Sequence, residues 1–213
     1  MTRRPDPVDV LRAGGVVLAP CPVGYLLAAS TAAGVREIFA RKGRSEDKPL
    51  SVGGWAAAEG LAFLDTLRPE AADALDAAGV TMGLVGRLRG GAPSTPPGVG
   101  AAGSVGVFIG LGPILAPLAA RARAAGARLF VTSANASGAG NCVLAAQLPP
   151  HLTEGIGWAC LDDAQIPAAQ RAAPRPAPSP MVELGPPVRW LRAGARQEQV
   201  AAALAAAGLP VPA

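Results

Sequence analysis

Apolar residues recur along the chain with two different spacings. Val35, Ile38 and Phe39 fall at i, i+3 and i+4, which places them on one face of a helix. Short continuous apolar runs, such as Leu129–Thr132, are typical of buried strands. The helical spacing predicts helices over Pro7–Ala13, Gly34–Arg41, Pro69–Ala77, Leu115–Ala125 and Gln197–Ala207. The apolar runs predict strands at Val16–Ala19, Leu50–Val52, Gly83–Val85, Val105–Ile109, Leu129–Thr132 and Val188–Leu191.

The alternation of these segments allows an α/β fold, with a single twisted mixed sheet flanked by helices. The chain has 213 residues, of which 50% are hydrophobic, and this is enough for one well-buried domain over residues 1–213. The Ala- and Pro-rich run Pro167–Pro180 is the best candidate for a mobile loop. Its Arg171 and Arg175 could close over bound phosphates, and a plain surface linker is the alternative interpretation.

Two short polar segments carry the candidate chemistry. Lys42-Gly43-Arg44 lies where Gly43 ends a predicted helix, and Lys48 follows in the same polar turn. Ser133-Ala134-Asn135 follows a predicted buried strand, and open α/β sheets bind ligands at the carboxyl ends of strands. Lys and Arg suit phosphate oxygens, while Ser and Asn donate and accept directional hydrogen bonds. Taken alone, the two cations would be interpreted as a solvated helix end.

Three motifs together resemble the YrdC/Sua5 family of threonylcarbamoyl-adenylate synthases. The family's K-x-R, K/R-P-L-S and T-S-A-N-x-S-G match Lys42-Gly43-Arg44, Lys48-Pro49-Leu50-Ser51 and Thr132–Gly138, in order and spacing. Weaker similarity is found at Leu11–Pro20, Ser104–Val107 and Leu191–Ala195, so the resemblance covers about residues 8–208. It implies a single YrdC-like domain with helices and a mixed sheet around a concave basic site. The first-strand loop, the Lys42 loop and the Ser133 loop should border that site.

The resemblance also implies an activity. Family members combine bicarbonate, L-threonine and ATP into threonylcarbamoyl-AMP and pyrophosphate, an early step of a tRNA modification. Lys42 and Arg44 would then be catalytic, because fixed cations stabilise the negative charge that gathers on the transferring phosphate. The residues implied to bind ATP and its phosphates are Lys42, Arg44, Lys48, Ser133, Asn135, Ser179 and Arg192. Mg²⁺ is expected on the phosphates, and no residue of the chain is predicted to bind a metal directly.

The chain departs from the family at the segments that face the amino acid. The family's P-T-D-T-x-Y-G-L appears as Pro20–Leu27, in which Cys21, Pro22 and Val23 replace two threonines and an aspartate. The family's V-R-x-P-x-H-P appears as Val107–Pro113, with Phe108 in place of the arginine. The candidate substrate-binding residues are Cys21, Val23, Tyr25, Thr81, Phe108 and Ser133. Since lost hydroxyls change discrimination strongly, we expect a different, less polar amine as acceptor.

These departures leave three functions open. The first is a divergent carbamoyl-adenylate-forming enzyme that uses ATP, bicarbonate or another carbamoyl donor, and an amino acid or other amine. The second is a carbamoyl transferase of a specialised pathway. The third is a non-catalytic protein that binds nucleotide or RNA, for which the net charge of +4 and a pI near 9.5 are the argument. Aromatic residues are only 4% of the chain, so few groups could stack on bases, and tRNA is expected as an indirect partner only.

Other motif-like features lack the context that would give them a function. Gly98–Gly103 spells G-x-G-x-x-G but precedes a predicted strand instead of following one, which favours a turn. Cys21, Cys142 and Cys160 have no metal-ligand spacing, and His151 is expected in a surface loop. Unpaired cysteines and the lack of a secretory apolar segment or a membrane-length run predict a cytoplasmic protein with no membrane partner.

Overall fold

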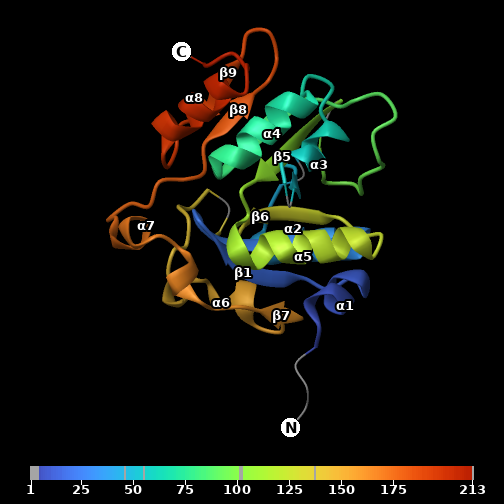
Figure 1. Ribbon diagram of the computed structural model, residues 1–213. Coiled ribbons are helices and arrows are strands. Elements are labelled where there is room, and N and C mark those ends of the chain that lie inside the picture. Colours follow the sequence, from blue (N-terminus) through green and yellow to red (C-terminus); the bar gives the residue numbers. More distant parts are fainter. Residues whose placement is uncertain (1–4, 46, 55, 101–102, 137, 213) are drawn as a thin grey trace.

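A computed structural model describes residues 5–45, 47–54, 56–100, 103–136 and 138–212. The strands form one sheet in the order β7-β1-β2-β6-β3-β5-β4-β8-β9 (Figure 1). Their bounds are β1 Val17–Cys21, β2 Gly24–Ala29, β3 Ser51–Gly53, β4 Met82–Arg87, β5 Ser104–Ile109, β6 Leu129–Ser133, β7 Trp158–Ala159, β8 Met181–Glu183 and β9 Arg189–Arg192. Parallel pairs (β1 with β7, β3 with β5, β4 with β8) mix with antiparallel ones, which confirms the predicted mixed α/β sheet.

The α-helices are short. They are α1 Pro7–Arg12, α2 Ala32–Lys42, α3 Ala58–Leu61, α4 Pro69–Ala78, α5 Gly112–Ala124, α6 Pro150–Thr153, α7 Ala168–Ala172 and α8 Gln197–Ala206, with 3-10 turns η1 Ala145–Gln147 and η2 Asp163–Gln165. The longest of these, α5, has 13 residues. Within the described ranges, no helix is long and apolar enough to cross a membrane.

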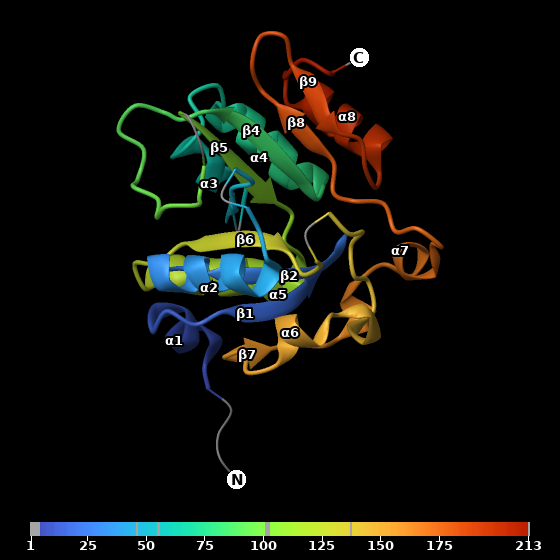
Figure 2. The ribbon, with the colours of Figure 1, turned by 180° about the vertical axis from the view of Figure 1, so that it is seen from behind.

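Helices cover both faces of the sheet, so its central strands are buried on two sides. Figures 1 and 2 show α5 over one face and α2 over the other. In β2, Leu26 and Ala28 pack into the core under α1 and α5, whereas Leu27 and Ala29 pack into the core that contains Val35 of α2. Successive side chains of a strand point to opposite faces, so a strand covered on both faces is apolar throughout.

This double burial explains the main error of the pattern analysis. Strand β2 has no polar alternation, and the strand predictions omitted it together with β7 and β8. The other strands and the five predicted helices lie where predicted, with ends shifted by up to three residues. The run Pro167–Pro180 contains α7 and is not wholly a loop, and His151 is exposed but lies in α6. Gly98, Gly100 and Gly103 lie in left-handed turns before β5, as expected; Ala101 and Ala102 lie outside the described residues.

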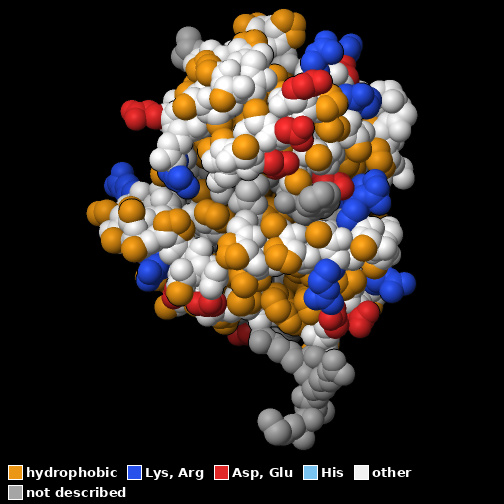
Figure 3. Space-filling model, viewed as in Figure 1, with side chains coloured by type: hydrophobic (Ala, Val, Ile, Leu, Met, Phe, Trp, Pro, Cys, Tyr) orange, Lys and Arg blue, Asp and Glu red, His pale blue; other side chains and the backbone are white. Residues whose placement is uncertain are grey.

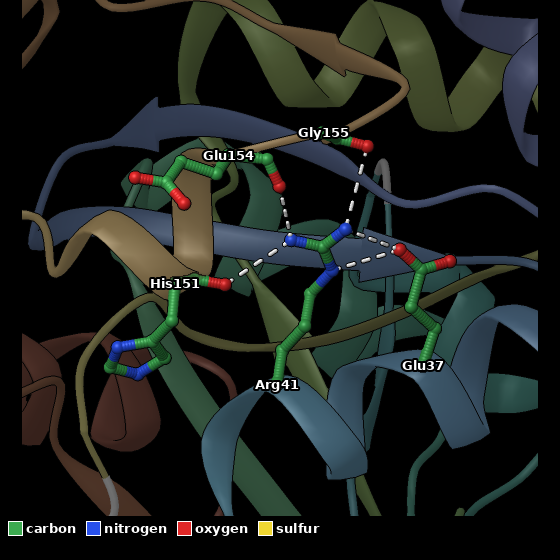
Figure 4. Close-up of polar contacts among 5 residues, drawn as sticks. All are labelled: Glu37, Arg41, His151, Glu154 and Gly155. Carbon is green, nitrogen blue, oxygen red and sulfur yellow. Dashed lines mark hydrogen bonds and ion pairs between the residues drawn. The ribbon is translucent and has the colours of Figure 1, made fainter.

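One arginine ties α2 to the segment around α6. Arg41 donates to the backbone carbonyls of His151 at 3.2 Å, Glu154 at 2.8 Å and Gly155 at 3.4 Å, and it also pairs with Glu37 one helical turn earlier (Figure 4). The imidazole ring of His151 points away from this arginine (Figure 4). These bonds satisfy carbonyls that a helix end leaves open. They also fix the end of α2, which carries Lys42.

Candidate active site

A cavity of about 130 Å³ lies where the β1–β2 turn, the loop after α2, the end of β6 and the β8–β9 pair meet; we call it the main cavity. Its polar lining consists of Arg44, Ser51, Thr132, Ser133, Asn141, Ser179 and Arg192. Its apolar lining consists of Val23, Leu26, Pro49, Phe108, Val131 and Met181, to which Gly24 and Tyr25 add. The main cavity therefore combines two guanidinium groups and several hydroxyls with an apolar wall.

Arg44 enters the main cavity because α2 ends just before it. Gly43 adopts the left-handed conformation at φ 54°, a helix-ending geometry that glycine takes without a steric penalty. The Arg44 guanidinium donates to the carbonyls of Lys48 and of Pro49, the latter at 3.1 Å. Burial lowers the pKa of Arg44 from 12.5, and a guanidinium nevertheless keeps its charge in proteins. A fixed positive charge thus lies on one side of the main cavity.

Arg192 supplies the second positive charge, from the last strand. Its Nε donates to the carbonyl of Ser179 and its Nη2 to the Ser179 hydroxyl, both at 2.8 Å. Ser179 is buried, and the loss of solvent around the guanidinium lowers the pKa of Arg192. Because two bonds orient it, Arg192 is presented to the main cavity in one defined direction.

Lys42 does not line the main cavity. It is only 4% exposed, and its Nζ donates to the backbone carbonyl of Asn135 at 2.8 Å, to Asn135 Oδ1 at 3.0 Å and to the carbonyl of Ser133. Burial and the neighbouring Arg44 charge lower the pKa of Lys42 from 10.5 to about 8. The two polar segments singled out in the sequence therefore meet. The contact is made by the buried ammonium group of Lys42, which holds the loop after β6.

The loop after β6 is organised by Asn135. Its Oδ1 accepts from the Ser133 hydroxyl at 2.5 Å, and its Nδ2 donates to the carbonyls of Ala139 and of Gly140, the latter at 3.1 Å. Asn135 is buried away from the cavity wall, whereas Ser133 forms part of that wall. Ser137, the second serine of the matched motif, lies outside the described residues.

The apolar side of the main cavity is formed by Val23, Phe108 and Tyr25. The hydroxyl of Tyr25 donates to Asp163 Oδ1 at 2.6 Å, and burial with this contact raises the tyrosine pKa. The phenol is therefore held in place by a residue from a distant turn. The tyrosine ring contributes apolar surface to the main cavity, while its hydroxyl proton is donated to Asp163.

Comparison with models of protein families identifies the family to which this chain belongs. Residues 9–194 match the family model for Sua5, YciO and YrdC proteins, which is described as telomere recombination. The chain belongs to the Sua5/YciO/YrdC family. No curated protein matches the chain significantly in sequence.

Solved structures show that the family fold extends over nearly the whole chain. The hypothetical protein smu.1377c of Streptococcus mutans UA159 has a TM-score of 0.78 at 17% identity, over 93% of this chain and 89% of its own. Sua5 of P. abyssi, solved with L-threonine, has a TM-score of 0.71 at 23% identity, over 92% of this chain. Full-length HypF in a phosphate- and nucleotide-bound form has a TM-score of 0.67 at 17% identity, over 88% of this chain. At these identities the likeness establishes the shared fold.

The chain spans only part of two of these relatives. It covers 56% of the Sua5 chain and 28% of the HypF chain.

Besides Lys42 and Asn135, three more residues expected at the site lie away from the main cavity. Cys21 is fully buried in the core, which raises its pKa to about 12 and makes its thiol an unreactive packing group. The side chain of Lys48 is exposed, and only its carbonyl contacts Arg44. The Thr81 hydroxyl donates to the Gly110 carbonyl at 2.8 Å. Their proposed contacts with ligand stay predictions.

Asn141 is the polar wall residue that motif reasoning missed. Its Nδ2 donates to the carbonyl of Val23 at 2.9 Å, which ties the loop after β6 to the β1–β2 turn. It lies beyond the matched T-S-A-N-x-S-G segment, and no local spacing marks it. Ser51, Thr132 and Met181 were also not assigned as site residues, although the first two lie within matched motifs. In the loop expected to close over phosphates, Arg171 instead donates to the Ile166 carbonyl at 3.0 Å.

Proposed function

We propose that this Sua5/YciO/YrdC protein forms a carbamoyl-adenylate from ATP, a one-carbon donor and an amine less polar than threonine. The observation that carries this proposal is that Arg44 and Arg192, from distant parts of the chain, line one cavity with Ser133. Two guanidinium groups and a hydroxyl suit a polyphosphate. The apolar wall of Val23 and Phe108 suits the carbon portion of an amine.

In this proposal, bicarbonate and the amine condense to a carbamate with loss of water. A carbamate oxygen then attacks the α-phosphorus of ATP, the bond from that phosphorus to the β-phosphate oxygen breaks, and pyrophosphate leaves. Arg44 and Arg192 hold phosphate oxygens and stabilise the charge that develops on them. The apolar wall limits water around the short-lived carbamate. Lys42 acts as a positioning residue, because its ammonium group holds the Ser133 loop.

Mg²⁺ would enter as part of the ATP substrate complex. No carboxylate lines the main cavity, and the described ranges contain no group of three His, Cys, Asp or Glu side chains that could hold a metal. The hydroxyls of Ser51, Thr132 and Ser133 are oxygen donors of the kind that Mg²⁺ accepts beside phosphate oxygens and water. The phosphates would therefore supply the charged ligands.

A carbamoyl transferase is the second candidate. The two guanidinium groups at the main cavity support it, because they would hold the phosphate of a carbamoyl phosphate as well as that of ATP. In that case the carbamoyl donor would be carbamoyl phosphate or a carbamoyl-adenylate.

Direct RNA binding is a weaker alternative. Arginines occur in pairs along the sequence, Arg87 with Arg89, Arg121 with Arg123 and Arg189 with Arg192. Four of them form ion pairs: Arg87 with Asp65, Arg121 with Asp6, Arg123 with Glu59, and Arg189 with Glu183. Arg3 and Arg4 lie outside the described residues. On the face in Figure 3, basic side chains are interspersed with acidic ones and form no continuous basic surface. Nucleic-acid binding usually needs such a surface.

ATP–pyrophosphate exchange tests the proposal. The full chain is incubated with Mg·ATP, labelled pyrophosphate and bicarbonate, together with one amine at a time from a panel that includes threonine. We expect exchange that depends on both bicarbonate and an amine, strongest with an amine less polar than threonine. Exchange that depends on carbamoyl phosphate would favour the transferase. ATP binding without exchange for any donor and amine would identify a nucleotide-binding protein.

A further inference from the structure

A second, smaller cavity also borders the β1–β2 turn, at Pro22 and Val23. It measures about 90 Å³, and we call it the side chamber. Its apolar lining comes from the turn, the end of α4, the start of α7 and the start of α8. The apolar residues are Pro22, Val23, Val80, Ala169, Ala195 and Val200. In Figure 3, hydrophobic side chains also gather on the surface over α7.

Val23 belongs to the walls of both the main cavity and the side chamber. Pro22 and Val23 are the two residues of the hairpin turn between Cys21 and Gly24, which pair across β1 and β2. Asn141 holds the Val23 carbonyl at 2.9 Å, and a Cβ on Gly24 would lie 2.7 Å from the carbonyl oxygen of Cys142. The turn is therefore fixed where the two cavities border it. At the position of a threonine in the family motif, it presents the apolar side chain of Val23.

The polar side chains of the side chamber are already engaged within the protein. The Thr81 hydroxyl donates to the Gly110 carbonyl, and the Gln170 amide donates to the Ala177 carbonyl at 2.6 Å. Arg196 donates to the side chain of Gln199. Against the apolar residues of the lining, a ligand hydroxyl or charge would lose its water without gaining a partner, whereas an alkyl group would lose only water.

We propose that the side chamber receives the aliphatic tail of the amine acceptor, while the amino group of that acceptor lies in the main cavity. This inference rests on the proposed function and specifies its substrate class: an amino acid or primary amine with an unsubstituted alkyl tail. Val23 is the specificity-determining residue, because the tail must pass it. A threonine in its place would put a hydroxyl at the entrance of the side chamber.

The test measures binding, so it does not depend on turnover. Alanine, 2-aminobutyrate, norvaline and norleucine are titrated into the full chain by calorimetry, with a non-hydrolysable ATP analogue and Mg²⁺ present. We expect affinity to rise about three- to fourfold per added methylene, as burial of alkyl surface requires. Ala169→Phe should fill the side chamber and abolish this rise. Ala172→Phe, on the exposed end of the same helix, should leave the rise unchanged and controls for the added ring.

Each outcome decides the inference. A length-dependent rise that Ala169→Phe removes and Ala172→Phe keeps supports it. Equal affinities along the series, a rise that survives Ala169→Phe, or no binding of any member would overturn it. Val23→Thr provides a second readout. In this variant, the ratio of the affinity for norvaline to the affinity for threonine should be smaller than in the wild type. Pyrophosphate exchange with any amine would uphold the proposed function even if the side chamber takes no tail.

Discussion

The ammonium group of Lys42 donates to both oxygens of Asn135, at 2.8 Å to the backbone carbonyl and at 3.0 Å to the side chain. This contact joins the end of α2 to the loop after β6. The same ammonium group also reaches the Ser133 carbonyl. The loop that presents Ser133 to the main cavity is therefore held by a buried charge.

Lys42→Met tests this role. Methionine keeps the length of the side chain but removes the Lys42 donor from three oxygens, of which Asn135 Oδ1 keeps its bond from the Ser133 hydroxyl. We expect a loss of about 1–2 kcal/mol in the free energy of unfolding and faster amide hydrogen exchange in residues 134–142. Urea unfolding and hydrogen-exchange mass spectrometry measure the two effects. Lys48→Met, at an exposed position in the next turn, should change neither. Unchanged exchange in the loop would show that Lys42 does not hold it.

The pKa of Lys42 predicts a pH dependence. Its value of about 8 in the folded protein lies below 10.5, so the unfolded chain binds more protons between these limits. The lowered pKa therefore adds a pH-dependent term to the free energy of unfolding, which is fully present above pH 10.5 and is lost as the pH falls through 8. Relative to Lys42→Met, the wild type should gain stability as the pH rises from 8 to 10. Urea unfolding of both proteins at several pH values measures this difference, and a constant difference would contradict the lowered pKa.

Arg44 and Arg192 should act on the same anion. Replacing either with glutamine removes a charge-assisted hydrogen bond, and we expect Mg·ATP affinity to fall about 10- to 100-fold in each variant. The double variant should lose less than the product of the two single losses, because groups that share a ligand are coupled. Calorimetric titration measures all three. Arg189→Gln is the matched control on the same strand, since Arg189 pairs with Glu183. Full additivity would place the two arginines on separate ligands.

Gly194 should be essential for the Arg192–Ser179 contact. A Cβ there would lie 2.2 Å from the Pro178 carbonyl oxygen and 2.6 Å from the Pro180 nitrogen, so Gly194→Ala must push this segment away. We expect at least a tenfold loss of Mg·ATP affinity and about 1–3 kcal/mol less stability. Gly185→Ala is the control, because its Cβ would meet nothing closer than 3.9 Å. Wild-type affinity in Gly194→Ala would show that the Ser179 segment does not position Arg192.

Sequence reasoning identified the segments of the site because local signals mark them. Gly43 ends a helix whose apolar face is readable, and Ser133 follows an apolar run that forms β6. That these segments touch is an expectation that the structure confirms. The assignments of ATP, Mg²⁺ and individual ligand contacts stay predictions.

The direction of a side chain was beyond local reasoning. The Lys42 side chain points into the protein, where it finds three acceptor oxygens on Ser133 and Asn135. These residues lie about ninety positions further along the chain, so the sequence around Lys42 does not reveal the direction of its side chain. The order of the sheet is equally non-local, since β6 pairs with both β2 and β3. Strand β2 shows why periodicity failed there, because burial on both faces removes the alternation by which a strand is recognised.

Arg192 closes the last strand of the sheet, and β9 pairs only with β8 at one edge. During synthesis, the ribosome therefore adds Arg192 after all the preceding strands, β1–β8, and after the turn that carries Arg44. A nascent polypeptide at that stage carries one of the two guanidinium groups that line the main cavity, and it still lacks the core residues Val200, Ala203 and Leu204 of α8. A chain cut short before β9 would therefore keep Arg44 and lose Arg192, the partner with which Arg44 is proposed to hold phosphate oxygens.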